Sequence, residues 1–233
     1  KGDGNPVVTV GGFTNDAIRA YDISNSNVPV RVDALTVDGA PGDFRASFRP
    51  AAPETPYLVL TDAAADLVPD LWADTPSKLK DPANGADYLV ITPSALVPGA
   101  RRLADYRAGK GLSSLVVDLE DVYDEFNHGM ASPYAIRDLV AYAHTSWARS
   151  PRFVVLVGDG TYDYKNVLGH GDNLVPPLMT ATPSGLFASD NRMAILPGGD
   201  GVPVAAVGRL PVMTLEDLNA LVDKIMAYES GEG

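Results

Sequence analysis

Several aspartates in the second half of the chain carry the side chains best suited to bind a cation. Asp159, Asp163 and Asp190 lie in segments rich in Gly and Pro, and Asp172 and Asp200 lie in the same stretch. Calcium prefers carboxylate oxygens, and α/β folds gather their sites at the carboxyl ends of parallel strands. The first three are therefore candidate calcium ligands. The alternative, and the commoner role of Asp beside Gly and Asn, is to close turns.

The segment Gly158-Asp159-Gly160 follows an apolar run and invites comparison with nucleotide-binding loops. The third glycine of G-x-G-x-x-G is missing, because Asp163 stands in its place. No helix pattern follows, so a pyrophosphate would lack the amides and dipole of a helix N-terminus. A phosphotransfer aspartate would usually be followed by a second Asp two residues on, where Thr161 stands. The sequence argues against both chemistries.

Nucleophilic catalysis has few candidate residues here. The chain contains no cysteine, which excludes disulfides, thiolate metal sites and a cysteine nucleophile within these residues. Its histidines are His128, His144 and His170, in dissimilar surroundings. In caspase-like peptidases a His-Gly step follows a buried apolar strand, whereas the polar segment 162–166 precedes His170. We expect His170 to be a solvated loop residue.

Composition narrows the class of protein. The chain has 233 residues, 45% of them apolar, which suffices for an ordinary core. Its formal net charge of -12 repels phosphate backbones, so nucleic acid is not an expected partner. No window approaches the length of a membrane span, and the first residues lack the apolar run of a signal peptide.

The elements that must position these residues fall into two regions. Residues 1–80 read as a small β-rich region and linker, with short extended runs broken by turn residues. Asp38-Gly39 is expected to form a hairpin turn, and the junction is placed within 63–87, which lacks a sustained apolar period. The expected strands are 7–10, 17–23, 28–37, 44–48 and 57–61.

Residues 81–233 alternate apolar strands with amphipathic helices, which predicts an α/β fold with a parallel sheet flanked by helices. Ser132-Pro133 begins one helix, and Thr214 with Asp217 begins the last. Residues 160–203 show little periodicity and are expected to form long loops. The expected strands are 88–91, 115–117, 153–157 and 204–207, and three helices are expected at 95–108, 132–147 and from 214 onward.

Five segments, in this order, resemble the gingipain family of cysteine peptidases. The resemblance covers roughly residues 80–229, and the preceding β-rich region resembles the segment before the peptidase unit in large secreted members. The segments are Ala86-Asp87-Tyr88-Leu89-Val90-Ile91-Thr92, 118–129, 153–165, Ser189-Asp190-Asn191 and Val207-Gly208-Arg209-Leu210-Pro211-Val212.

The resemblance implies a caspase-like first subdomain that lacks the catalytic dyad. In this family a histidine assists a cysteine thiolate that attacks a peptide carbonyl, and both residues lie in a second subdomain, after the matched segment. The chain is thus expected to be a non-catalytic N-terminal portion of a secreted or cell-surface endopeptidase. It would contribute fold support and one wall of the substrate cleft, with Asp200 aligned with the acidic residue that sets basic specificity.

The expected partners are the downstream catalytic subdomain and, through the full-length protein, a polypeptide substrate. No cofactor is required, and calcium is possible. Two other functions stay open: a peptidase-like binding or secretion-associated module without proteolysis, and a calcium-stabilised structural module. An apolar strand followed by His-Gly, and another followed by Ala-Cys or Gly-Cys, in the downstream sequence would favour the peptidase.

Overall fold

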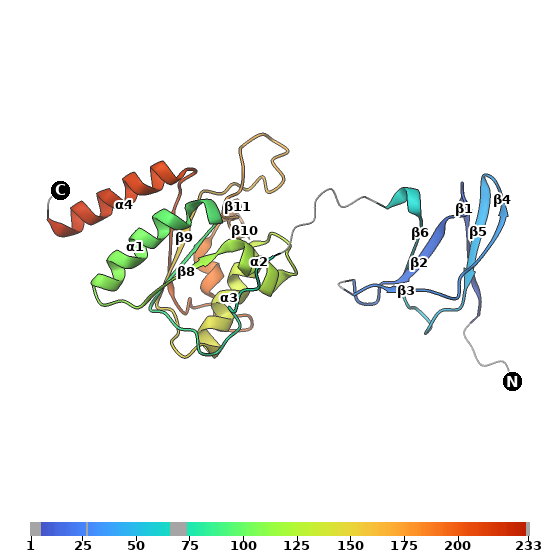
Figure 1. Cartoon of the computed structure of the whole chain (residues 1–233), viewed down its shortest axis with the longest axis horizontal. Helices are drawn as coiled ribbons and strands as arrows, with labels where there is room; N and C mark the ends of the chain where they lie inside the picture. Colours follow the sequence, from blue (N-terminus) through green and yellow to red (C-terminus); the bar gives the residue numbers. More distant parts are fainter. Residues whose placement is uncertain (1–5, 27, 66–73, 232–233) are drawn as a thin grey trace. The chain divides into compact units, whose positions relative to one another are not determined.

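The chain divides into two compact units. The computed structural model describes residues 6–26, 28–65 and 74–231, and the division falls between Lys1–Asp74 and Thr75–Gly233 (Figure 1). Part of the expected junction, residues 66–73, lies outside the described residues. The family motifs all belong to the second unit.

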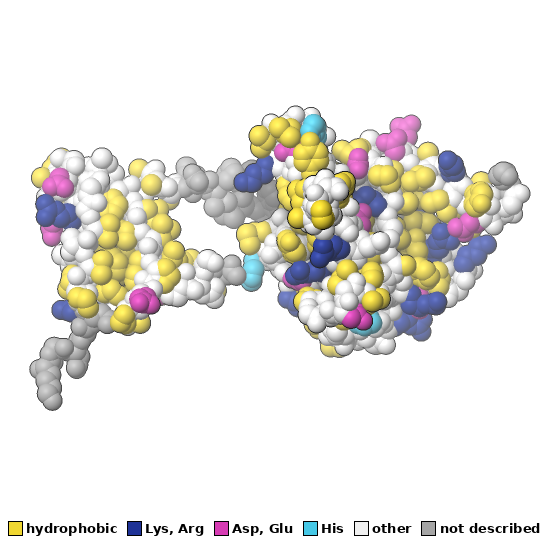
Figure 2. Space-filling view, turned by 180° about the vertical axis from the view of Figure 1, so that it is seen from behind, with side chains coloured by type: hydrophobic (Ala, Val, Ile, Leu, Met, Phe, Trp, Pro, Cys, Tyr) yellow, Lys and Arg dark blue, Asp and Glu magenta, His cyan; other side chains and the backbone are white. Residues whose placement is uncertain are grey.

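The first unit consists of two three-stranded antiparallel sheets. Their strand orders are β1-β5-β4 and β3-β2-β6. Alternate residues of β2 and β5, among them Ala20 and Ala46, are fully buried, while hydrophobic side chains also gather on one visible face of this unit (Figure 2). The strands are β1 (Val8–Phe13), β2 (Ile18–Asp22), β3 (Val30–Arg31), β4 (Thr36–Ala40), β5 (Asp43–Phe48) and β6 (Tyr57–Thr61).

Two details of the predicted β-rich region were wrong. Asp38 and Gly39 lie within β4, opposite Arg45 and Phe44 of β5, and the hairpin turns at Pro41-Gly42 instead. Gly42 has a φ of 92°, a conformation that glycine adopts at no steric cost. The single strand expected over 28–37 is two strands in different sheets, β3 and β4.

The second unit is built on a four-stranded parallel sheet with the order β12-β9-β7-β8. Tyr88 lies opposite both Ser114 and Phe153, and Phe153 lies opposite Ala206, so the strands are in register from their first residues. The sheet confirms the expected fold class. Its strands are β7 (Tyr88–Thr92), β8 (Ser114–Asp118), β9 (Phe153–Val157) and β12 (Ala206–Leu210).

Helices cover both faces of this sheet, so its central strands are apolar on both sides. Leu89 and Ile91 of β7 pack with α2 and α3, whereas Tyr88 and Val90 pack with α1 and α4. Figure 1 shows α1 and α4 running side by side on one face. The helices are α1 (Val97–Gly109), α2 (Leu119–Asn127), α3 (Pro133–Ser146) and α4 (Leu215–Ser230).

Side-chain caps fix where these helices begin. Ser132 Oγ accepts a hydrogen bond from Tyr134 N, and Thr214 Oγ1 accepts one from Asp217 N, as the sequence predicted. Asp118 caps α2, which was not among the three expected helices. This helix was missed because its many acidic residues obscured the apolar periodicity of the face on which Val122 and Tyr123 are buried.

The long loop region expected over 160–203 holds additional structure. A two-stranded hairpin and a short 3-10 helix form within it, and the 3-10 helix packs against α3 and β12. None of the helices in the described part of the chain has both the length and the apolar composition of a membrane-spanning segment. The elements are β10 (Met179–Thr182), β11 (Gly185–Ala188) and η3 (Asp190–Ala194).

Core packing gives the first prediction. Leu139 of α3 is fully buried in the cluster between α3 and the sheet. Leu139→Ala leaves a cavity there, so we expect the free energy of unfolding of this unit to fall by about 3 kcal/mol in urea titrations. The matched control is Leu168→Ala, because Leu168 is 62% exposed. Equal effects of the two substitutions would contradict this packing.

A second prediction concerns acid sensitivity. Asp87 Oδ2 accepts hydrogen bonds from Ser113 Oγ at 2.7 Å and Arg149 NH1 at 2.8 Å. These contacts, Ser113 first, lower the pKa of Asp87. A lowered folded-state pKa stabilises the fold at neutral pH, and this contribution is lost as pH falls from about 4 through the folded pKa. Asp87→Asn should therefore flatten the decline in stability below pH ~4.

Urea titrations at several pH values between neutral and acid provide the measurement. The control is Asp105→Asn, an exposed aspartate on α1. If Asp87→Asn and the wild-type chain lose stability in parallel on acidification, the ionised Asp87 does not stabilise the fold at neutral pH.

Candidate functional site

The site lies where β9 and β12 reach the carboxyl edge of the sheet. Beyond Val157, Gly158 N donates to Leu210 O at 3.0 Å and Asp159 N donates to Val212 O at 2.9 Å, so the chain continues along β12 before it turns away. Gly158 has a φ of 139°, and a Cβ there would lie 2.8 Å from Val175 Cγ2. Only glycine satisfies both constraints at this position.

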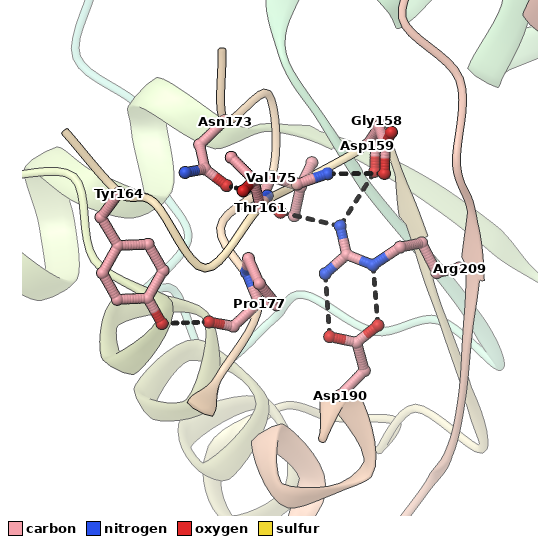
Figure 3. Close-up of polar contacts among 10 residues, drawn as sticks. Gly158, Asp159, Thr161, Tyr164, Asn173, Val175, Pro177, Asp190 and Arg209 are labelled. Carbon is pink, nitrogen blue, oxygen red and sulfur yellow. Dashed lines mark hydrogen bonds and ion pairs between the residues drawn. The ribbon is translucent and has the colours of Figure 1, made fainter. Parts of the chain in front are cut away.

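A single arginine joins three segments at this edge (Figure 3). Arg209 of β12 binds the carboxylate of Asp190 through both oxygens, Nε to Oδ2 at 2.7 Å and NH2 to Oδ1 at 2.8 Å. Its NH1 also donates to Gly158 O at 2.9 Å and to Val175 O at 2.7 Å. Three of the segments that carry the family resemblance therefore meet at one guanidinium group.

The Arg209–Asp190 pair is largely shielded from water, with side chains 14% and 23% exposed. A charge in such a place is stabilised only when its donors are paired. The planar guanidinium presents its donors in a fixed fork, so it binds a carboxylate and two carbonyls at once, which a lysine ammonium cannot do in this geometry. This arrangement is structural: it fixes the loop that follows β9.

Asp163 organises that loop. It is 8% exposed, and its carboxylate accepts hydrogen bonds from Val167 N at 2.9 Å and Leu168 N at 2.5 Å. Asp159 is engaged locally, because its Oδ1 accepts from Gly160 N at 2.8 Å. Asn173 supports the same loop by accepting from Thr161 N at 2.6 Å.

The candidate calcium ligands thus have separate protein partners. Asp190 binds Arg209, Asp163 binds backbone amides and Asp159 accepts a hydrogen bond from the adjacent Gly160 amide. Within the described ranges, no three or more His, Cys, Asp or Glu side chains form a group arranged to hold a metal ion. Calcium binding stays a prediction from the sequence.

Asp200, the candidate specificity residue, lies in an exposed turn. Its Oδ1 accepts a hydrogen bond from Val202 N at 3.0 Å, and the nearby Gly198 and Gly201 both have positive φ. No described contact joins it to Asp159 or Asp190. The contacts at this edge therefore do not involve Asp200, and its role in substrate binding stays a prediction from the sequence.

A pocket of about 640 Å³ opens beside the loop, and three tyrosines contribute to its walls. Tyr123 comes from α2, Tyr134 from the first turn of α3, and Tyr164 from the loop after β9. Tyr164 OH donates to Pro177 O, which holds its ring in place (Figure 3). His170 lies outside this pocket lining, exposed, with Nε2 2.9 Å from Tyr162 OH.

Sequence reasoning did not single out Arg209 or the three tyrosines as site residues. A signal for Arg209 existed, because it is a lone charge among the apolar residues that follow the predicted strand 204–207, and the structure extends this strand to Leu210. The tyrosines offered no such signal, since they come from three elements that only the tertiary fold brings together.

The Arg209 pair gives the third prediction. Arg209→Met leaves the Asp190 carboxylate shielded and unpaired, so we expect a loss of about 3 kcal/mol in unfolding free energy. Arg102→Met is the matched control, because Arg102 is 44% exposed in its pair with Asp223, and such surface pairs contribute less than about 1 kcal/mol. Similar losses in both variants, measured by urea titration, would refute the special role of Arg209.

The second unit matches a known protein family. The family model described as Peptidase family C25 matches residues 81–233. A comparison with curated protein sequences finds no match.

Two solved structures are similar to this chain, and one of them shares its fold. The crystal structure of dimeric latent PorU from Porphyromonas gingivalis has a TM-score of 0.67 and 21% identity, over 97% of this chain and 23% of the PorU chain. A structure described as a protease has a TM-score of 0.48 and 18% identity, over 62% of this chain and 28% of that one. The chain therefore spans less than a third of either protein, and at this identity the likeness to PorU concerns the fold. Because the family match covers more than half of its residues, the chain belongs to peptidase family C25, the gingipain family.

Proposed function

We propose that the chain is the non-catalytic N-terminal portion of a secreted or cell-surface gingipain-like cysteine endopeptidase. The observation that carries this proposal is the combination of a peptidase family match over residues 81–233 with a sequence that contains no cysteine. In this role the chain supports the fold of the peptidase and forms one wall of its substrate cleft.

The chemistry requires a second part. A cysteine peptidase attacks the peptide carbonyl with a thiolate, takes up and returns a proton through a histidine, and stabilises the oxyanion with backbone amides. A downstream subdomain of the parent protein would supply these groups. Its substrate would be a polypeptide, which reaches the chain only through the full-length protein.

The sheet offers a place for that subdomain. β12 lies at the end of the strand order and has one strand neighbour, β9, among the described residues. An unpaired strand edge needs cover in a stable protein. Asp200 lies in the turn shortly before β12, so the same edge would bring it near an added subdomain.

A second candidate function is a peptidase-like binding or secretion-associated module without proteolysis. The aromatic pocket favours it, because a pocket of about 640 Å³ has the size of a ligand site. The activity of the full-length parent distinguishes the two functions.

The fourth prediction is that the chain alone hydrolyses no arginyl, lysyl or other peptide substrate. Without a thiol, no conformation or ionisation state offers the nucleophile. The assay uses fluorogenic peptides and casein, with and without calcium and reductant.

A thiol-alkylating reagent provides the control, since it cannot modify a chain without cysteine. Activity abolished by alkylation belongs to a contaminant. Activity that survives alkylation and co-purifies with the chain would contradict the proposal.

A further inference from the structure

The chain contains one Asn-Gly pair, Asn84-Gly85, in the loop that leads into β7. Gly85 is exposed and Asn84 is partly exposed, so water reaches both residues. An asparagine followed by glycine is the pair most prone to deamidation, because glycine has no side chain to obstruct the attack of its main-chain nitrogen on the asparagine Cγ. The pair is therefore a candidate site of chemical modification.

The fold requires glycine after Asn84. A Cβ at Gly85 would lie 2.8 Å from Arg149 Cβ and 2.9 Å from Arg149 N, closer than such atoms approach one another in proteins. The main chain is held against Arg149 here, because residues 85 and 149 form an isolated β-bridge and Ala86 N donates to Arg149 O at 3.3 Å. The residues whose side chains would slow the reaction are thus excluded from this position.

The nitrogen of Gly85 is free to react. The contacts around the bridge use the neighbouring main-chain groups instead, because Asn84 O accepts from Ala148 N at 2.9 Å and Ala86 N donates to Arg149 O. Among the hydrogen bonds of the described residues, none uses Gly85 N. An exposed amide without a partner loses its proton to hydroxide more readily than a hydrogen-bonded one. The deprotonated nitrogen is the nucleophile that deamidation needs.

The side chain of Asn84 anchors the loop 78–84. Its Nδ2 donates to Lys78 O at 2.6 Å and to Leu79 O at 3.4 Å. The same loop is bound to the end of α3, because Trp147 Nε1 donates to Leu79 O at 2.8 Å. A carboxylate in place of the amide would lose both donors and would bring its charge against two carbonyl oxygens. Deamidation would therefore weaken this anchor.

We propose that Asn84 is a self-modification site, which water converts to aspartate and isoaspartate without an enzyme. Hydroxide removes the Gly85 N proton, and the nitrogen attacks Asn84 Cγ and closes a succinimide ring. The Cγ–Nδ2 bond breaks, and ammonia leaves after taking a proton from water. Water then opens the ring at either carbonyl. The reaction does not depend on the proposed function, because it uses only two adjacent residues and solvent.

The two products change the loop differently. In the aspartate the main chain is intact and only the two donors of the side chain are lost. In the isoaspartate the main chain runs through Cβ and Cγ, so the carbonyl that accepts from Ala148 N no longer links residues 84 and 85. Both products loosen the contact between the loop 78–84 and the end of α3, and the isoaspartate loosens it more.

Mass spectrometry of the full chain, incubated folded at mildly alkaline pH, tests the reaction. The tryptic peptide 81–101 contains Asn84 as its only asparagine. We expect this peptide to gain the mass of deamidation with time, at a rate proportional to hydroxide concentration, and to separate into two isomers. A sample digested before incubation corrects for reaction during digestion.

Two controls accompany this measurement. The tryptic peptide 210–224 contains Asn219, which Ala220 follows in α4, and it should stay unmodified in the same sample. The Asn84→Gln chain should also stay unmodified at this position, because a glutamine would have to close a six-membered ring and does so more slowly.

Thermal unfolding tests the consequence. Asn84→Asp, which reproduces one product, should lower the melting temperature of the second unit by about 4 °C. The matched control is Asn219→Asp, because its side-chain oxygen still accepts from Arg102 NH1, now at 2.7 Å, and the melting temperature should not fall. Hydrogen exchange at the Ala148 amide should be faster in Asn84→Asp than in the wild-type chain.

Three results would overturn the proposal. The first is a folded chain in which peptide 81–101 gains no more mass than peptide 210–224. The second is a folded chain that stays unmodified at Asn84 over a period in which the urea-unfolded chain reacts, because the fold would then block the site. The third is a melting temperature of Asn84→Asp equal to that of the wild-type chain, which would remove the anchoring role of the amide.

Discussion

The arrangement of the carboxyl edge depends on one largely shielded guanidinium group. Arg209 gives its donors to acceptors from three segments that are distant in sequence, the end of β9, the loop through Val175, and η3 with Asp190. Each acceptor satisfies part of a charge that the fold has withdrawn from water. These contacts therefore fix the conformation of the loop after β9. The pocket beside this loop is shaped by that conformation.

The sheet beneath this edge imposes a constraint of its own. Both faces of β7 are covered, so odd and even residues of one strand belong to different cores. Leu89 and Ile91 pack with α2 and α3, and Val90 packs with α1 and α4. A shift in register by one residue would exchange these two sets. Because both faces are buried, the residues of β7 before Thr92 are all apolar or aromatic.

Much of this fold was predictable from the sequence, because its central elements are locally encoded. The apolar run 153–157 and the caps at Ser132 and Thr214 appear where expected. The hairpin β10–β11 was missed because β11 is exposed along its whole length and therefore has no buried apolar face that a sequence pattern could reveal. The site was predictable only in part. Arg209 stands out in the sequence as a charge among apolar residues, whereas Tyr123, Tyr134 and Tyr164 are brought together only by the tertiary fold.

The pairing of α1 with α4 has a consequence for synthesis on the ribosome. Arg102 and Arg107 of α1 bind Asp223 and Glu229 of α4, more than a hundred residues later. Until the 16 residues of α4 emerge, part of the surface around Val90 has no cover. A nascent chain therefore presents this apolar strip to chaperones, or to other nascent chains, while the residues between α1 and α4 are translated.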